Sequence, residues 1–197
     1  MIPSYVFIGP RGGSVPIRLA LLGGISPEDL VSTSAIVKLL VELDLAPLLA
    51  QDFALFSYPV ADPVRASRRS PDFWTDAPDP MKRYFEQELA ENQPDGVITA
   101  MGNEAISGFQ IQVSSRLIAT EVLWPALEIV QRLLPLASEP IQTFPQPRNS
   151  QLRSVPFSLI IRTPRYMPFE NQVSAIAFSV KQILHHYRAL VSQVDKL

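Results

Sequence analysis

Four acidic residues are the side chains of this 197-residue chain with the clearest capacity for chemistry. Cysteine is absent, which excludes disulfides, thiol catalysis and zinc sites built from Cys. The acids could instead bind a hard cation such as Mg²⁺ or Ca²⁺ through their carboxylate oxygens. They are Asp29, Asp62, Asp72 and Glu104.

The segment Ser26-Pro27-Glu28-Asp29 has two interpretations. Ser26 could be a nucleophile only beside a base, and no histidine lies near it in the sequence. Serine is also a preferred N-cap, proline suits the first helical position, and acids suit the first turn. We therefore interpret the segment as a helix start capped by Ser26.

The two histidines, His185 and His186, are adjacent within a long helical pattern. Neighbouring side chains on a helix diverge by about 100°, so these two cannot readily share one metal ion. Their place in the last turns of the helix favours protonation through the helix dipole. We predict a solvated structural role for both.

Three arginines, Arg65, Arg68 and Arg69, could bind a phosphate or a carboxylate. Alternatively, they belong to a solvated loop in which nearby acids offset their charge. We prefer the second interpretation, because four aspartates occur in the same stretch: Asp62, Asp72, Asp76 and Asp79.

Apolar periodicity predicts the elements that must position these residues. Strands are expected at 5–8, 17–22, 53–58, 96–101, 108–113 and 157–162, with an irregular segment or edge strand at 135–147. Helices are expected at 27–43, 80–92 and 119–134. A last helix has one apolar face at spacings of three and four, formed by Val173, Ile176, Ala177, Val180, Ile183, Leu184, Tyr187 and Leu190.

This alternation of strands and helices predicts an α/β fold. We expect a three-layer sandwich, with a mostly parallel or mixed twisted sheet flanked by helices, in one domain covering residues 1–197.

Composition argues against several classes of function. The net charge of −2 offers no general attraction to nucleic acid or to an anionic membrane. No apolar run approaches the roughly 20 residues that span a bilayer, and the N-terminus lacks the features of a signal peptide. A cytoplasmic protein is the expectation.

Six segments in their order along the chain resemble the zinc carboxypeptidase superfamily, in its succinylglutamate desuccinylase and aspartoacylase-like branch. They are residues 7–13, 17–25, 58–63, 95–98, 156–164 and 172–188. The resemblance implies a zinc-carboxypeptidase-like fold of the phosphorylase/hydrolase-like type. It also implies a zinc ion held by two His and one Glu, with a second Glu as general base.

The resemblance places other residues at every one of these positions. Ser26 and Met101 stand where the two zinc histidines would be, and Asp29 stands where the ligand Glu would be. Arg162, before Thr163-Pro164, stands at the general-base position, and arginine cannot accept a proton at neutral pH. The substrate-binding segment of the family is shortened here to residues 65–74.

The resemblance therefore implies a catalytically inactive relative of zinc carboxypeptidases, a pseudo-peptidase without a cofactor and without zinc. We expect it to bind a protein partner or a small anionic ligand in the former cleft. One alternative is a metallo-hydrolase, of the carboxypeptidase or acyl-amino-acid deacylase type, with a metal site of carboxylates. Another is a structural partner of an active relative, which a large exposed apolar patch would favour.

The substitution at position 162 leads to a specific structural prediction. A guanidinium at the former base position should occupy part of the vacated zinc site and neutralise Asp29, or a neighbouring acid such as Glu104.

Overall fold

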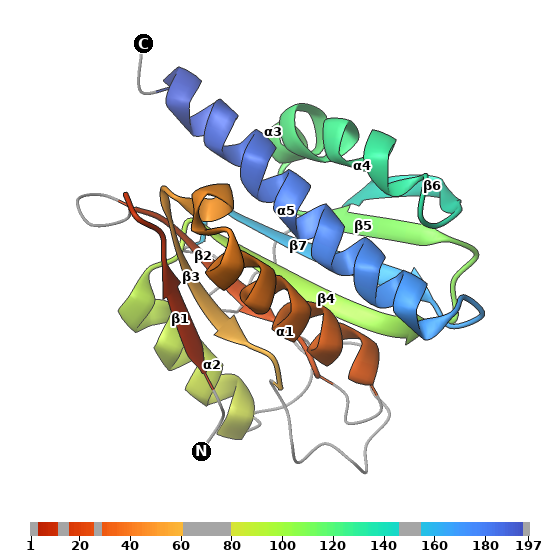
Figure 1. Cartoon of the computed structure of the whole chain (residues 1–197), viewed down its shortest axis with the longest axis horizontal. Coiled ribbons are helices and arrows are strands. Elements are labelled where there is room, and N and C mark those ends of the chain that lie inside the picture. Colours follow the sequence, from red (N-terminus) through yellow and green to blue (C-terminus); the bar gives the residue numbers. More distant parts are fainter. Residues whose placement is uncertain (1–3, 12–15, 26–28, 61–79, 146–154, 195–197) are drawn as a thin grey trace.

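Seven strands form one mixed sheet in the order β1-β3-β2-β4-β7-β5-β6 (Figure 1). The structure is a computed structural model that describes residues 4–11, 16–25, 29–60, 80–145 and 155–194. The strands are β1 (Tyr5–Ile8), β2 (Ile17–Leu22), β3 (Phe53–Tyr58), β4 (Gly96–Glu104), β5 (Phe109–Val113), β6 (Leu136–Thr143) and β7 (Phe157–Pro164).

The centre of the sheet is parallel. β3 and β4 each pair in parallel with β2, and β7 pairs in parallel with β4. Two antiparallel pairs, β1 with β3 and β5 with β7, extend the sheet on either side of this centre. The carboxyl ends of β2, β3, β4 and β7 consequently meet at one edge, which is where an α/β sheet ordinarily positions its functional groups.

Helices cover both faces of the sheet unequally. One face packs against α1 (Leu30–Leu45), η1 (Pro47–Ala50) and α5 (Phe169–Val194), and also against the run of α3 (Arg116–Ile118), η2 (Ala119–Leu123) and α4 (Trp124–Val130). The other face packs against α2 (Pro80–Asn92), through Leu89 and a smaller cluster that includes Leu22 and Val97. Figure 1 shows α1 and α5 side by side over the sheet, with α2 behind it.

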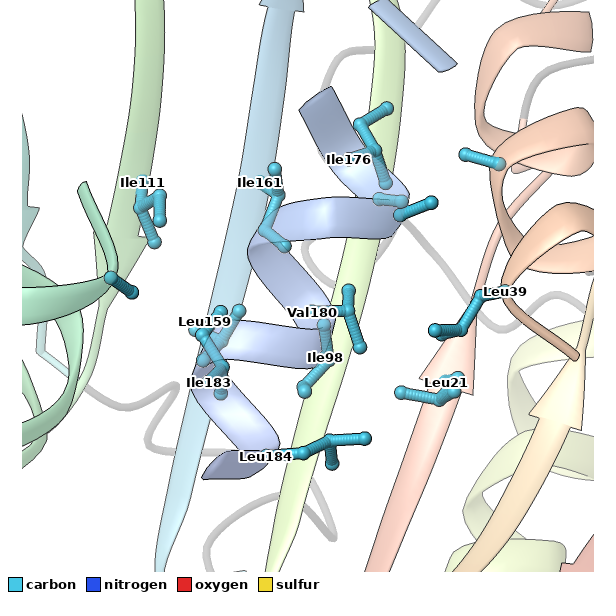
Figure 2. Close-up of a cluster of buried hydrophobic side chains, with 14 of the residues drawn as sticks. Leu21, Leu39, Ile98, Ile111, Leu159, Ile161, Ile176, Val180, Ile183 and Leu184 are labelled. Atoms are coloured by element: carbon cyan, nitrogen blue, oxygen red, sulfur yellow. The ribbon is translucent and has the colours of Figure 1, made fainter. Parts of the chain in front are cut away.

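The main core lies between α5 and the sheet (Figure 2). Val180, Ile183 and Leu184 of α5 are buried against Ile98 of β4 and Leu159 of β7. This packing explains the apolar face of the last helix, because residues three and four apart lie on one side of a helix. The predicted three-layer α/β fold with a mixed sheet is confirmed.

Several element boundaries differ from the prediction. β4 continues past Met101 to Glu104, and β7 includes Thr163 and Pro164 rather than ending before them. The helix expected at 119–134 begins at Arg116, contains the π-helical turn η2 and ends at Val130. The segment after it forms the edge strand β6, which accommodates Pro140.

The first long helix also begins later than expected. Its N-cap is Asp29, whose side chain accepts a hydrogen bond from the Ser32 N–H, so the prediction of a cap at Ser26 is wrong. Among the described residues, no helix is long and apolar enough to cross a membrane.

Candidate functional site

The candidate site lies at the carboxyl ends of β4 and β7. Met101 of β4 is the register partner of Arg162 of β7, and the pairing then shifts before Glu104 meets Pro164. The irregularity coincides with Asn103, whose φ of 56° is in the left-handed region that asparagine tolerates better than most residues. This bulge turns the backbone of residues 102–104 towards groups from α1 and α5.

Asp29 is the buried acid of the site. Its Oδ1 accepts a hydrogen bond from the Ser32 N–H at 3.0 Å. Its Oδ2 accepts one from the Ser32 hydroxyl at 2.6 Å and one from the Gly102 N–H at 3.0 Å. Both carboxylate oxygens thus accept hydrogen bonds from groups of the protein itself. The residue is only 7% exposed.

Gly102 is required by this close approach. A Cβ at position 102 would lie 2.3 Å from the Cβ of Val31 and 2.6 Å from Oδ1 of Asp29. Both distances are shorter than any ordinary contact, so a larger residue would push the end of β4 away from α1. The N-cap of α1 and the bulge of β4 thus fit together only with glycine here.

Ser32 extends the contact to the turn between β2 and α1. Its hydroxyl oxygen accepts a hydrogen bond from the Gly24 N–H at 2.8 Å while the hydroxyl donates to Asp29. Gly24 has a φ of 55°, a conformation that costs glycine little. Asp29 therefore links three segments: the turn at Gly24, the start of α1 and the end of β4.

The environment of Asp29 changes its acidity. Burial raises the pKa of the Asp29 carboxyl above its ordinary value, and the negative charge of Glu104 adds to the increase. The hydrogen bonds from Ser32 and Gly102 act in the opposite direction and limit the rise in pKa. Burial is the largest of these effects.

Arg162 forms the charged part of the site. Its Nη2 donates to Oε2 of Glu104 at 2.6 Å, and each of the two side chains is 24% exposed. The prediction that Arg162 neutralises an acid at this edge is confirmed for Glu104, while no ion pair joins Arg162 to Asp29. Nε of Arg162 is buried without a hydrogen-bond partner.

Gln172 of α5 holds the bulge from the other side. Its Oε1 accepts hydrogen bonds from the Thr163 hydroxyl at 2.8 Å and from the Asn103 N–H at 3.1 Å. Its Nε2 donates to the Met167 carbonyl oxygen at 2.7 Å. Gln172 and Thr163 are both buried, so this amide gives the Thr163 hydroxyl a partner inside the protein, and it also binds the backbone of the exposed Asn103.

The structure tests only part of the predicted site. Asp29, Met101, Glu104 and Arg162 lie on elements that meet at one edge of the sheet. The remaining predicted site residues are outside the described part of the chain: Ser26, Asp62, Arg65, Arg68, Arg69 and Asp72.

The described residues at this edge do not fit a zinc ion. Zinc in proteins takes imidazole, thiolate or carboxylate ligands with free lone pairs. Met101 offers only a weak thioether, Arg162 carries a positive charge, and the oxygens of Asp29 already accept three hydrogen bonds. Within the described residues, no group of three or more His, Cys, Asp or Glu side chains is arranged to hold a metal ion.

The histidine pair corrects one expectation. His185 and His186 lie in α5 with ring centroids 5.1 Å apart, and the helix continues beyond them to Val194. Burial, together with the charge of His185, lowers the pKa of His186 below its ordinary value. The expectation that the helix dipole favours its protonation is therefore wrong, because desolvation outweighs a dipole effect that acts mainly within the last turn.

Three residues of the site had no predicted role: Ser32, Gly102 and Gln172. The spacing Asp29-x-x-Ser32 is a local capping signal, since a cap side chain accepts from the N–H three residues later. No local signal identifies their links to the bulge, because Asp29 is 73 residues from Gly102 and Asn103 is 69 residues from Gln172.

Comparison with known proteins supports the fold and not the chemistry. No protein-family model matches the sequence, and no curated protein matches it significantly. Solved structures do match, with sequence identities low enough to show a shared fold alone.

Three of these structures show the range of similarity and of coverage. A provisionally named metallopeptidase from Shewanella denitrificans OS217 has a TM-score of 0.69 at 15% identity, over 94% of this chain and 79% of its own. A metallo-carboxypeptidase from Burkholderia cenocepacia has a TM-score of 0.69 at 14% identity, over 95% and 61%. The cell shape determinant protein Csd4 from Helicobacter pylori has a TM-score of 0.63 at 13% identity, over 94% and 54%. The fold is thus that of metallopeptidases and metallo-carboxypeptidases.

Proposed function

We propose that this chain is a catalytically inactive domain with the metallo-carboxypeptidase fold, which acts by binding a partner and not by hydrolysis. Within that fold we assign it to the succinylglutamate desuccinylase and aspartoacylase-like branch, on the sequence segments that resemble it. The observation that carries the proposal is the ion pair of Arg162 with Glu104, at the position where the resemblance expects a general base.

The chemistry of hydrolysis motivates this conclusion. A metal-dependent hydrolase needs an activated water and a group that can take its proton. Arg162 cannot take a proton, and its charge is directed at Glu104. The positive charge of the guanidinium would also repel a dication bound beside it. This repulsion is stronger in a partly buried site than in water.

Asp29 supports the same conclusion from the ligand side. Its carboxylate serves as the helix cap and as the acceptor for the Gly102 N–H. A metal ion could use its oxygens only by displacing these hydrogen bonds, which would leave buried N–H groups without partners. The acid therefore has a structural role in place of the ligand role.

Partner binding is favoured by the surface of α1. Leu30, Val41 and Leu45 are 62%, 53% and 82% exposed on one helix. Exposed apolar groups that gather in one place are typical of a protein interaction site. We therefore propose a protein partner ahead of a small anionic ligand.

The test is a zinc analysis combined with an activity panel. After mild dialysis we expect no stoichiometric zinc, and we expect no turnover of peptides or acyl-amino acids with added Zn²⁺, Mg²⁺ or Mn²⁺. Chelator-sensitive turnover that survives repurification would contradict the proposal. It would favour a metallo-hydrolase that uses carboxylates, including residues beyond the described part of the chain.

A variant that restores the family pattern provides the positive control. Ser26→His, Asp29→Glu, Met101→His and Arg162→Glu together should bind zinc, because they supply two imidazoles and a carboxylate. Turnover should remain low, because the family's substrate-binding segment is shortened in this sequence. A variant that folds but retains no zinc would show that these positions are not a former metal centre.

A further inference from the structure

Most hydrogen-bond donors of Arg162 are unused. A guanidinium carries N–H donors on three nitrogens in a planar fork. Within the described residues, the fork of Arg162 makes one hydrogen bond, from Nη2 to Glu104 at 2.6 Å, and its buried Nε–H has no acceptor. Proteins ordinarily satisfy a buried donor with a protein group, a water or a ligand, because an unpaired one is costly. The Nε–H is therefore a donor available to a ligand.

The strands on either side of β7 leave this donor free of competing charge. Met101 of β4 and Gln110 of β5 are the register partners of Arg162, one from each side. Register partners lie on the same face of a sheet, roughly 5 Å apart. The thioether of Met101 is a weak acceptor, and Nε2 of Gln110 donates to the Glu139 carbonyl oxygen at 3.3 Å. Arg162 thus lies between two uncharged side chains.

A second arginine lies against the same acid. The Arg165 N–H donates to the Glu104 carbonyl oxygen at 2.9 Å. The side chain of Arg165 is exposed and takes part in none of the ion pairs between described residues. Glu104 alone is paired with this positive charge, since the carboxyl of Asp29 is held by neutral donors. The edge can therefore accept a further negative charge.

The charges at this edge select the kind of anion. A guanidinium fork matches the two oxygens of a carboxylate or of a phosphate. Glu104 would repel either ligand, and the repulsion of a doubly charged phosphate would be about twice that of a singly charged carboxylate. Arg162 would repel a cation. A carboxylate is consequently the ligand that fits best.

A side chain next to Arg162 can give the ligand access. The Nε atom is covered, so a ligand reaches it only when a neighbouring group moves. Met101 is half-buried, and methionine is unbranched, with three rotatable bonds that let it adapt to a ligand. A change of its rotamer needs no movement of β4.

We propose that Arg162 binds a ligand carboxylate through its Nε–H, with Met101 and Gln110 on either side of the site and Arg165 at its rim. The inference rests on the proposed binding function, for which it names the ligand chemistry. The two fail separately: an absence of carboxylate binding would leave the zinc and turnover results unchanged, and turnover would not remove a carboxylate bound at Arg162.

The first test follows the Arg162 Nε–H signal by NMR in the ¹⁵N-labelled protein at pH 7. The signal is assigned by its loss in Arg162→Met. Sodium acetate up to about 100 mM should shift it downfield in a saturable manner, because a hydrogen bond to a carboxylate forms. Sodium chloride at equal ionic strength is the control and should not shift it.

The second test separates the fork from its charge. Arg162→Lys keeps the positive charge but loses Nε, and it should weaken acetate binding about tenfold, as measured on the backbone signals of β7. Glu104→Gln should instead strengthen acetate binding about tenfold, because it removes the competing negative charge. Arg132→Met, which removes an exposed arginine after α4, is the matched control and should leave the affinity unchanged.

The third test identifies the source of the carboxylate. An end-blocked Gly-Gly-Glu-Gly-Gly peptide represents an acidic side chain of a protein partner, and acetate represents a small free acid. Tighter binding of the peptide would assign the site to a protein partner, whereas tighter binding of acetate would assign it to a small acid. The same peptide with Gln in place of Glu should bind neither the wild type nor Glu104→Gln.

Four outcomes would overturn the proposal. The Nε–H signal could remain unshifted at about 100 mM acetate, or chloride could shift it equally. Arg162→Lys could bind acetate as well as the wild type, which would indicate general charge attraction. Glu104→Gln could weaken binding. Phosphate could bind more tightly than acetate, which would mean that Glu104 does not limit the charge of the ligand.

Discussion

Two polar clusters lie close together at the carboxyl edge of the sheet, and they balance charge in different ways. The first is the Asp29 cluster, in which a buried carboxyl is held by neutral donors of Ser32 and Gly102. The second is the Arg162–Glu104 pair, in which two opposite charges meet while each side chain remains 24% exposed. Neutral hydrogen-bond donors hold the Asp29 carboxyl, whereas the attraction of opposite charges holds Arg162 and Glu104 together.

The difference indicates separate roles. Asp29 is the N-cap of α1 and also fixes the end of β4, so it is part of the architecture. Its negative charge is further stabilised by the N-terminus of the helix. The Arg162–Glu104 pair joins β7 to β4 beyond the bulge, and solvent reaches both side chains. Asp29 should therefore matter more for stability than the ion pair.

The largest effect is expected for Asp29→Ala. The substitution removes the cap and leaves the N–H groups of Ser32 and Gly102 without an acceptor, which should lower the free energy of unfolding by about 3 kcal/mol. Urea unfolding followed by circular dichroism measures the change. Glu128→Ala, which removes an exposed carboxylate from α4, is the control and should change it by less than about 0.5 kcal/mol.

Arg162→Met should have a smaller effect. It keeps much of the aliphatic stem but leaves Glu104 without its partner, and we expect a loss of about 1 to 2 kcal/mol because the pair is partly exposed. The double variant with Glu104→Gln should lose less than the sum of the two single variants. Additive losses would mean that the pair contributes nothing as a pair.

The two clusters should also differ in their response to pH. The folded-state pKa of Asp29 is raised, so the folded protein holds this proton more tightly than the unfolded chain. Its contribution favours folding below the ordinary aspartate pKa and is lost as the pH rises through the raised folded value. As the pH rises across this interval, the free energy of unfolding of the wild type should therefore fall relative to that of Asp29→Asn.

Unfolding of both proteins over a pH series provides the measurement. The difference between them removes the titration of all other carboxylates. If the wild type instead became more stable relative to Asp29→Asn with rising pH, the hydrogen bonds would outweigh burial and the folded pKa of Asp29 would be lowered.

The smallest effect concerns Asn103, which lies between the two clusters. Its φ of 56° suits glycine, so Asn103→Gly should change the free energy of unfolding by only a few tenths of a kcal/mol, while Asn103→Ala should cost about 1 kcal/mol. Thermal unfolding of the two variants separates them. Equal effects would show that the backbone conformation at the bulge is not the determining factor.

Part of this site could be predicted from sequence. From the resemblance, the sequence predicted that the guanidinium of Arg162 would neutralise Asp29 or a neighbouring acid such as Glu104, and the ion pair is formed with Glu104. The prediction of the N-cap at Ser26 was wrong because both Ser26 and Asp29 are residues that favour an N-cap, and local sequence does not choose between them. The choice of Asp29 depends on where the turn at Gly24 directs the chain.

The sequence by itself determined the types and order of the elements. Periods of two and of three to four residues follow from strand and helix geometry, and they are visible locally, as in the apolar face of α5. The sequence could not determine which groups satisfy Asp29, because Gly102 is 73 residues away and its N–H points at the carboxylate only through the bulge in β4. Likewise, the spacing in α1 makes both of its sides apolar, but only the packed fold shows which side is buried and which remains exposed. Local geometry is encoded over a few residues, whereas these contacts arise from the order of the strands and the packing of helices against them.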